Sequence, residues 1–119
     1  MSKHFDYFSD HNAAQPIAKQ TKTIELFSKV EEWGRERALD KEEYRFKQAL
    51  KVMEEVGETM SALAKEKPEA IKDGIGDSIV TLIILAMQCG TSAEECLTLA
   101  YNEIANRKGD TINGVFIKK

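Results

Sequence analysis

Apolar residues return every three or four positions over much of the chain, and this spacing predicts helices. The first helix is expected over residues 23–38, and the second from about residue 40 to residue 67. A capping-box-like pair, Asp40 and Glu43, would begin the second helix. The apolar positions of the first are Ile24, Phe27, Val30 and Trp33, and those of the second are Phe46, Leu50, Met53, Val56, Met60 and Leu63. Core packing is the expected role of Trp33 and Phe46 on these faces, and of Tyr101 on the apolar face of the fourth helix.

A third helix is expected to run from Pro68, which suits a first helical turn, to about Gln88, before a stop at Gly90. Its run from residue 79 to residue 87 is apolar on nearly all sides and has the length of a buried strand. We favour a helix because no breaker precedes this run. A helix of this kind is expected to be central in the fold or to face a second subunit.

A fourth helix is expected after a cap at Thr91 or Ser92 and before Gly109. Residues 1–22 show no sustained period and are interpreted as an irregular arm. Residues 110–119 are expected to be an extended tail with a turn at Asn113–Gly114. Four helices with short connections predict an all-α, four-helix-bundle-like domain over residues 23–109.

Composition narrows the functional classes. The 119 residues suggest one domain, and 17 basic against 20 acidic side chains give a net charge of −3, which disfavours binding to polymeric nucleic acid. Cys89 and Cys96 form no CxxC pair and have no neighbouring His, so no structural zinc site is expected. The chain shows no signal-peptide pattern and its apolar run is too short for a membrane span, so we expect a cytoplasmic protein without membrane contact.

Candidate chemistry begins with the acidic cluster of the second helix. Glu54, Glu55 and Glu58 are three or four residues apart and project from neighbouring positions on one side of the helix. Three carboxylates this close repel one another unless a cation lies among them, and a hard divalent cation prefers oxygen ligands. Gly57 removes a side chain at the centre of this cluster.

A second acidic pair begins the apolar part of the third helix. Asp73 and Asp77 are four residues apart on one face, and Gly74 and Gly76 lie between them. Each glycine costs a helix roughly 1 kcal/mol relative to alanine, so a close backbone approach or a bend is expected there. The two acidic groups could form a metal site between facing helices. The alternative is that both are solvated helix faces.

The segments Glu54-Glu55-Val-Gly-Glu58 and Asp73-Gly-Ile-Gly-Asp77, followed by the stretch Ala100–Gly109, resemble the MazG-like all-α nucleoside triphosphate pyrophosphohydrolases. The resemblance implies hydrolysis of (d)NTP to (d)NMP and pyrophosphate with Mg²⁺, or Mn²⁺, in a homodimer or homotetramer. Glu55 and Glu58 match the family's ExxE pair, and Asp77 matches the Asp of its ExxD pair. The Glu of ExxD falls on Gly74, which cannot bind a metal, and Asp73 could substitute for it.

Further roles follow from the same resemblance. The implied metal ligands are Glu55, Glu58, Asp73 and Asp77, and Glu54 is a candidate general base. The candidate substrate-binding residues are Lys51, Asn102, Arg107, Lys108 and Trp33. Each has a simpler interpretation: a helix-surface pair for Lys51, favourable charge at a helix end for Arg107 and Lys108, a surface amide for Asn102 and core packing for Trp33.

A different functional class stays open. A helical interaction or regulatory module could keep this fold without catalysis, and Gly74 is the feature that favours it. Retention of Glu55, Glu58 and Asp77 favours the enzyme. A DNA-binding helix-turn-helix fits poorly, because acidic residues stand where a recognition helix would be basic.

Overall fold

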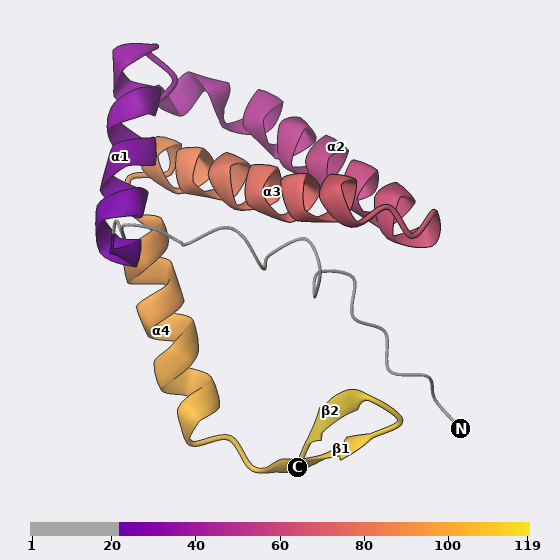
Figure 1. Cartoon of the computed structure of the whole chain (residues 1–119). Helices are drawn as coiled ribbons and strands as arrows, with labels where there is room; N and C mark the ends of the chain where they lie inside the picture. Colours follow the sequence, from indigo (N-terminus) through magenta and orange to yellow (C-terminus); the bar gives the residue numbers. More distant parts are fainter. Residues whose placement is uncertain (1–21) are drawn as a thin grey trace.

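A computed structural model describes residues 22–119 and gives four α-helices followed by a β-hairpin (Figure 1). The helices are α1 (Thr23–Glu36), α2 (Arg45–Ala64), α3 (Pro68–Gln88) and α4 (Ala93–Ala105), and a short 3₁₀ turn, η1 (Glu42–Tyr44), precedes α2. The strands are β1 (Gly109–Ile112) and β2 (Val115–Lys118). The all-α prediction is therefore confirmed, with a small hairpin added. The predicted irregular arm lies, apart from Lys22, outside the described residues.

Helix α3 is the central element, because α1, α2 and α4 all contact it. Its predicted limits at Pro68 and Gln88 are confirmed, and the alternative of a strand over residues 79–87 is wrong. Gly90 follows with a φ of 80°, a conformation that glycine adopts without strain. Ser92 then caps α4, since its side chain accepts a hydrogen bond from the backbone N–H of Glu95 at 3.1 Å.

Four helix boundaries differ from the prediction. Helix α1 ends at Glu36 rather than at residue 38, and α2 ends at Ala64 rather than near residue 67. Helix α2 begins at Arg45 rather than near Asp40, because residues 42–44 form the tighter 3₁₀ turn, and no side chain caps either element. Helix α4 ends at Ala105 rather than at Gly109, because Gly109 already belongs to β1 and pairs with Lys118.

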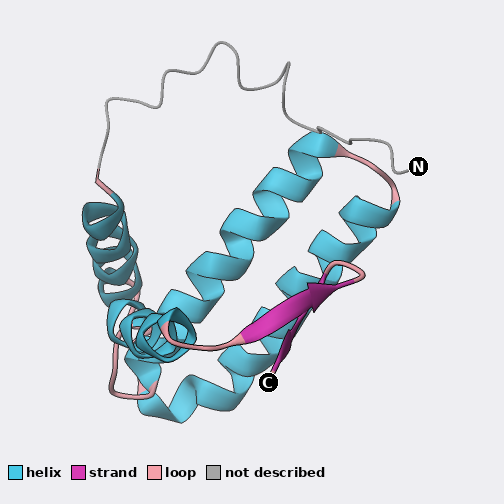
Figure 2. Cartoon of the chain, turned by 90° about the horizontal axis from the view of Figure 1, so that it is seen from below, coloured by secondary structure: helices cyan, strands magenta, loops and turns pink. Residues whose placement is uncertain are grey.

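Helices α2 and α3 lie side by side along their length, as Figures 1 and 2 both show. Small and hydroxyl-bearing residues form their contact. Gly74 lies so close to Thr59 that a Cβ at position 74 would overlap the threonine hydroxyl. Thr59 donates its hydroxyl to the Glu55 carbonyl at 2.7 Å, and Ser78 donates to the Gly74 carbonyl at 2.7 Å. Both hydroxyls thus satisfy backbone acceptors inside their own helices, so they can be buried at low cost.

The apolar core is small and centres on α3. Its buried members are Ala62, Ile71, Ile83 and Ile84. Helix α1 reaches this core where Gly34 faces Ile84. No described helix is long and apolar enough to cross a membrane.

The apolar face of α2 does not join this core. Glu55, Thr59 and Ala62 are the buried residues of α2, whereas Phe46 is 81% exposed. The expectation of core packing is therefore wrong for Phe46, and also for Tyr101 of α4, which is 61% exposed. The physical reason is that α3 packs on the side of α2 that carries small residues, which allow the closer approach.

The hairpin stands apart from the helices. Its register pairs Asp110 with Ile117 and Ile112 with Val115, and a turn at Asn113 (φ 52°) and Gly114 (φ 80°) joins the strands, as predicted. Within residues 22–119 the two strands approach only each other. The radius of gyration is 16.9 Å, larger than the roughly 13 Å expected for a compact domain of about 100 residues.

Candidate functional site

An open pocket of about 760 Å³ lies where the end of α1, the start of α2 and the middle of α3 meet. Two predicted carboxylates, one from α2 and one from α3, reach this pocket together with several cationic side chains. The charged and aromatic lining residues are Trp33, Arg37, Tyr44, Lys47, Lys51, Glu55 and Asp77. Its volume is in the range of small-molecule sites, so the pocket is large enough for a nucleotide-sized ligand.

Lys51 is the centre of the charge network on α2. Its Nζ lies 3.3 Å from Glu55 Oε1 and 3.5 Å from Glu54 Oε1. The hydrogen bond to Glu55, followed by the charge of Glu54, raises the pKa of Lys51 above its ordinary value. Glu55 is only 9% exposed, so this ammonium compensates a carboxylate that has lost most of its contact with water.

Glu58 is repelled by the neighbouring carboxylates of the acidic cluster. The charge of Glu55, then partial desolvation and the charge of Glu54, raise the pKa of the Glu58 carboxyl above its ordinary value. The predicted repulsion among these three carboxylates is therefore present, and Lys51 relieves only part of it. Oxygen donors of this kind suit Mg²⁺. Within residues 22–119, however, no three acidic, His or Cys side chains are gathered closely enough to hold a metal ion as they stand.

The remaining wall of the pocket is aromatic and amide-bearing. The Arg37 guanidinium lies over the Trp33 ring, 4.4 Å from its centroid, and donates to the Trp33 carbonyl at 3.0 Å. Gln48 donates to the Thr81 carbonyl at 3.0 Å and ties α2 to α3. Gln88, which is 3% exposed, donates to the Leu39 carbonyl at 2.6 Å and holds the loop after α1 against the end of α3.

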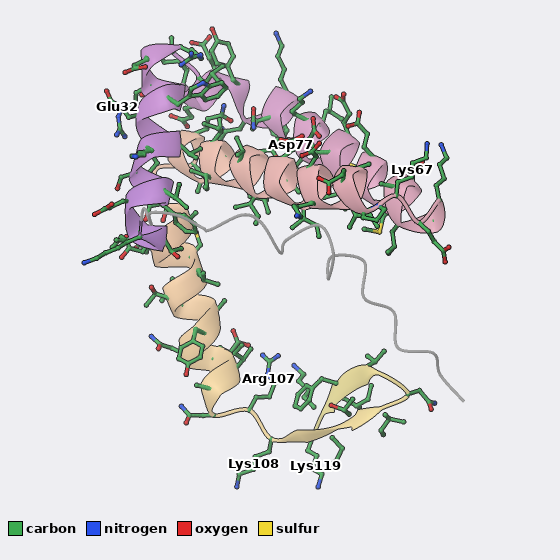
Figure 3. All side chains as sticks on the ribbon, viewed as in Figure 1. Glu32, Lys67, Asp77, Arg107, Lys108 and Lys119 are labelled. Carbon is green, nitrogen blue, oxygen red and sulfur yellow. The ribbon has the colours of Figure 1, made fainter. Side chains whose placement is uncertain are left out.

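Several predicted site residues lie elsewhere. Asp73 is exposed and does not line the pocket, and Asn102 is exposed on α4. Arg107, two residues after the end of α4, pairs with Glu103 of that helix. Figure 3 shows Arg107 and Lys108 at the far end of α4, well away from Asp77. Within one chain, the structure brings Glu55, Asp77, Lys51 and Trp33 to one pocket. The other predicted site residues do not line it: Glu54, Glu58, Asp73, Asn102, Arg107 and Lys108.

Position 74, where the sequence resemblance would place a glutamate, is a tightly packed glycine. Its close contact with Thr59 leaves no room for a side chain at this position. The expected close backbone approach is therefore confirmed at Gly74. It is wrong for Gly76, since a Cβ at this position would meet nothing within 4 Å. The space beside Gly57, where the sequence lacks a side chain, is open in the same way.

Sequence reasoning missed Arg37, Lys47 and Gln48 as lining residues. Two of them carried a readable signal: Arg37 follows Trp33 by four residues, and Lys47 precedes Lys51 by four, so each pair shares a helix face. Gln48 carried no such signal, because its place in the pocket depends on which face of α2 meets α3.

Comparison with known proteins adds one relative. The chain is 45% identical over 64 residues, or 54% of its length, to an uncharacterized 18.2 kDa protein of the rep-hol intergenic region of Haemophilus phage HP1 (strain HP1c1). The match covers 39% of that protein, so the chain corresponds to less than half of the relative. No protein-family model matches the chain, and no solved structure matches it.

Proposed function

We propose that the protein is a MazG-like nucleoside triphosphate pyrophosphohydrolase that uses Mg²⁺ or Mn²⁺ to convert (d)NTP to (d)NMP and pyrophosphate. The single observation that carries this proposal is the pocket in which Glu55 of α2 and Asp77 of α3 lie beside cationic side chains. Carboxylates from two helices can share a divalent cation, and the cations around them suit a polyanionic ligand.

The roles follow from the charges in the pocket. Glu55 and Asp77 of the pocket are the proposed metal ligands, together with Glu58, which follows Glu55 by one turn of α2, and Glu54 is the proposed base. The cation, when bound, would neutralise phosphate charge and make a water molecule more acidic. The Lys51 ammonium pairs with Glu55, so a metal ion bound by Glu55 would compete with Lys51 for this carboxylate. Metal binding would therefore release the Lys51 ammonium toward a phosphate, with Lys47 and Arg37 as further cations.

The test is release of pyrophosphate from a panel of ribo- and deoxyribonucleoside triphosphates by the full chain with Mg²⁺ or Mn²⁺. Asp77→Asn and Glu58→Gln are expected to remove at least nine-tenths of the activity, since each loses a proposed ligand. Glu69→Gln is the matched control, because Glu69 is an exposed acid of the same helix α3 that does not line the pocket. Equal activity in all variants, or no activity on any triphosphate, would refute the proposal.

A second function, a non-catalytic interaction module, is favoured by one observation: position 74 packs against Thr59 and has no room for an acidic ligand. Thermal unfolding separates the two. A metal that binds only the folded chain raises its melting temperature, by an amount that grows with metal concentration. A module without a metal site is expected to melt at the same temperature with Mg²⁺, Mn²⁺ or EDTA.

A further inference from the structure

Gln88 carries a buried hydrogen-bond acceptor that the described chain does not use. This residue ends α3, lines the pocket and is 3% exposed. Its Oε1 oxygen is buried and accepts no hydrogen bond from residues 22–119. A buried acceptor without a partner costs free energy, and most buried polar atoms in folded proteins have one. The exception at Gln88 therefore indicates a donor that comes from a ligand of the pocket.

The orientation of the Gln88 amide is fixed by the loop after α1. Its Nε2 donates to the Leu39 carbonyl at 2.6 Å. An amide turned by 180° would place Oε1 against that carbonyl, and two acceptor oxygens at this distance repel each other. The oxygen therefore stays an acceptor, and its complement is an N–H or O–H donor of the ligand.

Gln88 lies at the opposite end of the pocket from the proposed metal site. Asp77 precedes Gln88 by three turns of α3, which separates the two by about 16 Å at 1.5 Å per residue. Gly34 of α1 packs against Ile84, one turn before Gln88. Trp33 adjoins Gly34 and lines the pocket, so it lies toward the same end. The pocket thus has acidic residues at one end and an aromatic ring with a buried acceptor at the other.

Nucleobases differ in the group that they carry farthest from the sugar. This group is an amino donor in adenine and cytosine, and a carbonyl oxygen in guanine, uracil and thymine. An amino group would give Gln88 Oε1 the partner that it lacks. A carbonyl oxygen would set two acceptors against each other. A site that forms a buried hydrogen bond to one ligand discriminates strongly, because the wrong ligand leaves buried polar groups unpaired.

We propose that the pocket selects nucleotides with an amino-bearing base, adenine or cytosine, whose exocyclic amino group donates to Gln88 Oε1. The inference rests on the proposed function, because the proposed metal site at Glu55 and Asp77 holds the phosphates. An extended nucleoside triphosphate carries its phosphates and this edge of its base at opposite ends. The pocket places Asp77 and Gln88 in the same way.

The test compares nucleotide pairs that differ at this edge of the base: dCTP with dUTP, and ATP with ITP. With the full chain and Mg²⁺ or Mn²⁺, the kcat/KM for pyrophosphate release is expected to favour the amino member by about 10-fold or more. Gln88→Met keeps a side chain of similar length without the acceptor, and is expected to bring the ratio within each pair close to one. Gln48→Met is the matched control. Gln48 lines the same pocket and donates to the Thr81 carbonyl, but within the described chain it leaves no buried acceptor unpaired. The ratio is expected to persist in this variant even if its rate falls.

Binding of the monophosphates separates this inference from the proposed function. Calorimetry without metal gives the dissociation constants of dCMP against dUMP and of AMP against IMP, and tighter binding of the amino member is expected. Such a preference without any pyrophosphate release would refute the pyrophosphohydrolase and support base selection. Pyrophosphate release with equal kcat/KM within each pair would overturn base selection and leave the proposed function. A ratio that is unchanged in Gln88→Met would also overturn it, as would equal binding, or no binding, of all four monophosphates. The comparison of pairs on the unaltered chain does not depend on whether Gln88→Met folds.

Discussion

The α2–α3 pair and the arm formed by α4 and the hairpin differ in which residues they bury. In the pair, Gly74, Thr59 and Ser78 allow the two backbones to approach closely, and hydroxyl groups bond to carbonyls of their own helices. In the arm, larger residues such as Tyr101 and Ile117 remain half exposed or more. Small residues thus pack between α2 and α3, whereas the large apolar residues of α2 and α4 that the sequence pattern assigns to a core lie on the surface.

The largest expected effect is a loss of core packing at Ile84. Ile84→Ala removes a 2%-exposed side chain and is expected to lower the free energy of unfolding by about 3 kcal/mol, measured by urea denaturation. Ile104→Ala, at a 54%-exposed residue of the arm, is expected to change it by less than about 0.5 kcal/mol under conditions where the chain is monomeric. Equal losses of unfolding free energy in the two variants would show that Ile104 is packed as tightly as Ile84.

The second effect concerns the closeness of the α2–α3 pair. Gly74→Ala is expected to lower the free energy of unfolding by about 1–2 kcal/mol, because the new Cβ overlaps Thr59 and overpacking exceeds the gain in helix propensity. Gly76→Ala is the matched control and is expected to raise stability by about 1 kcal/mol, since nothing lies within 4 Å. Chemical denaturation of both variants measures the difference. Stabilisation by both substitutions would mean that the helices are not in close contact at Gly74.

The third expected effect is a loss of stability at Ser92, which caps α4 at the connection between α3 and α4. Ser92→Ala removes the hydrogen bond to the Glu95 N–H and is expected to lower the free energy of unfolding by about 1 kcal/mol. Ser61→Ala, on an exposed position inside α2, is the comparison and is expected to be neutral or slightly stabilising. Thermal melts of the two variants give the difference. An unchanged melting temperature in Ser92→Ala would show that the stability of α4 does not depend on this cap.

The smallest expected effect is the pH dependence of stability that the acidic cluster produces. It is measured on protein kept free of metal by EDTA. The pKa of Glu58 is raised above its ordinary value of 4.5 in the folded chain, so the folded chain binds more protons than the unfolded chain just above that pH. Stability therefore falls as pH rises through this window. Glu58→Gln is expected to raise the melting temperature slightly at neutral pH and to leave it unchanged below the ordinary carboxyl pKa. A lower melting temperature at neutral pH would show that Glu58 is not under repulsion.

The sequence predicted local features well. The limits of α3, the Ser92 cap and the Asn113–Gly114 turn were readable because proline, glycine, serine and asparagine act within a few residues of their own position. The side of α2 that packs was not readable. Periodicity identifies an apolar face, but it does not say whether that face meets α3 or another chain.

The candidate site was predictable to a similar degree. Glu55, Asp77 and Lys51 were found from spacing, and they meet in the pocket because α2 and α3 are neighbours in sequence and in space. The place of Arg107 and Lys108 depends on where α4 leads, and no local pattern encodes that direction. Gln48 depends on the register of α2 against α3, which Gly74 and Thr59 set.

The contact between Gly74 and Thr59 also constrains how this chain can change over evolutionary time. Position 74 accepts a larger residue only if position 59 becomes smaller first, because the added Cβ would meet both the side chain and the backbone of Thr59. The two positions are therefore expected to vary together among relatives, with alanine or glycine at 59 wherever 74 carries a side chain. A descendant that acquires an acidic residue at 74 would have to pass through such a change at 59.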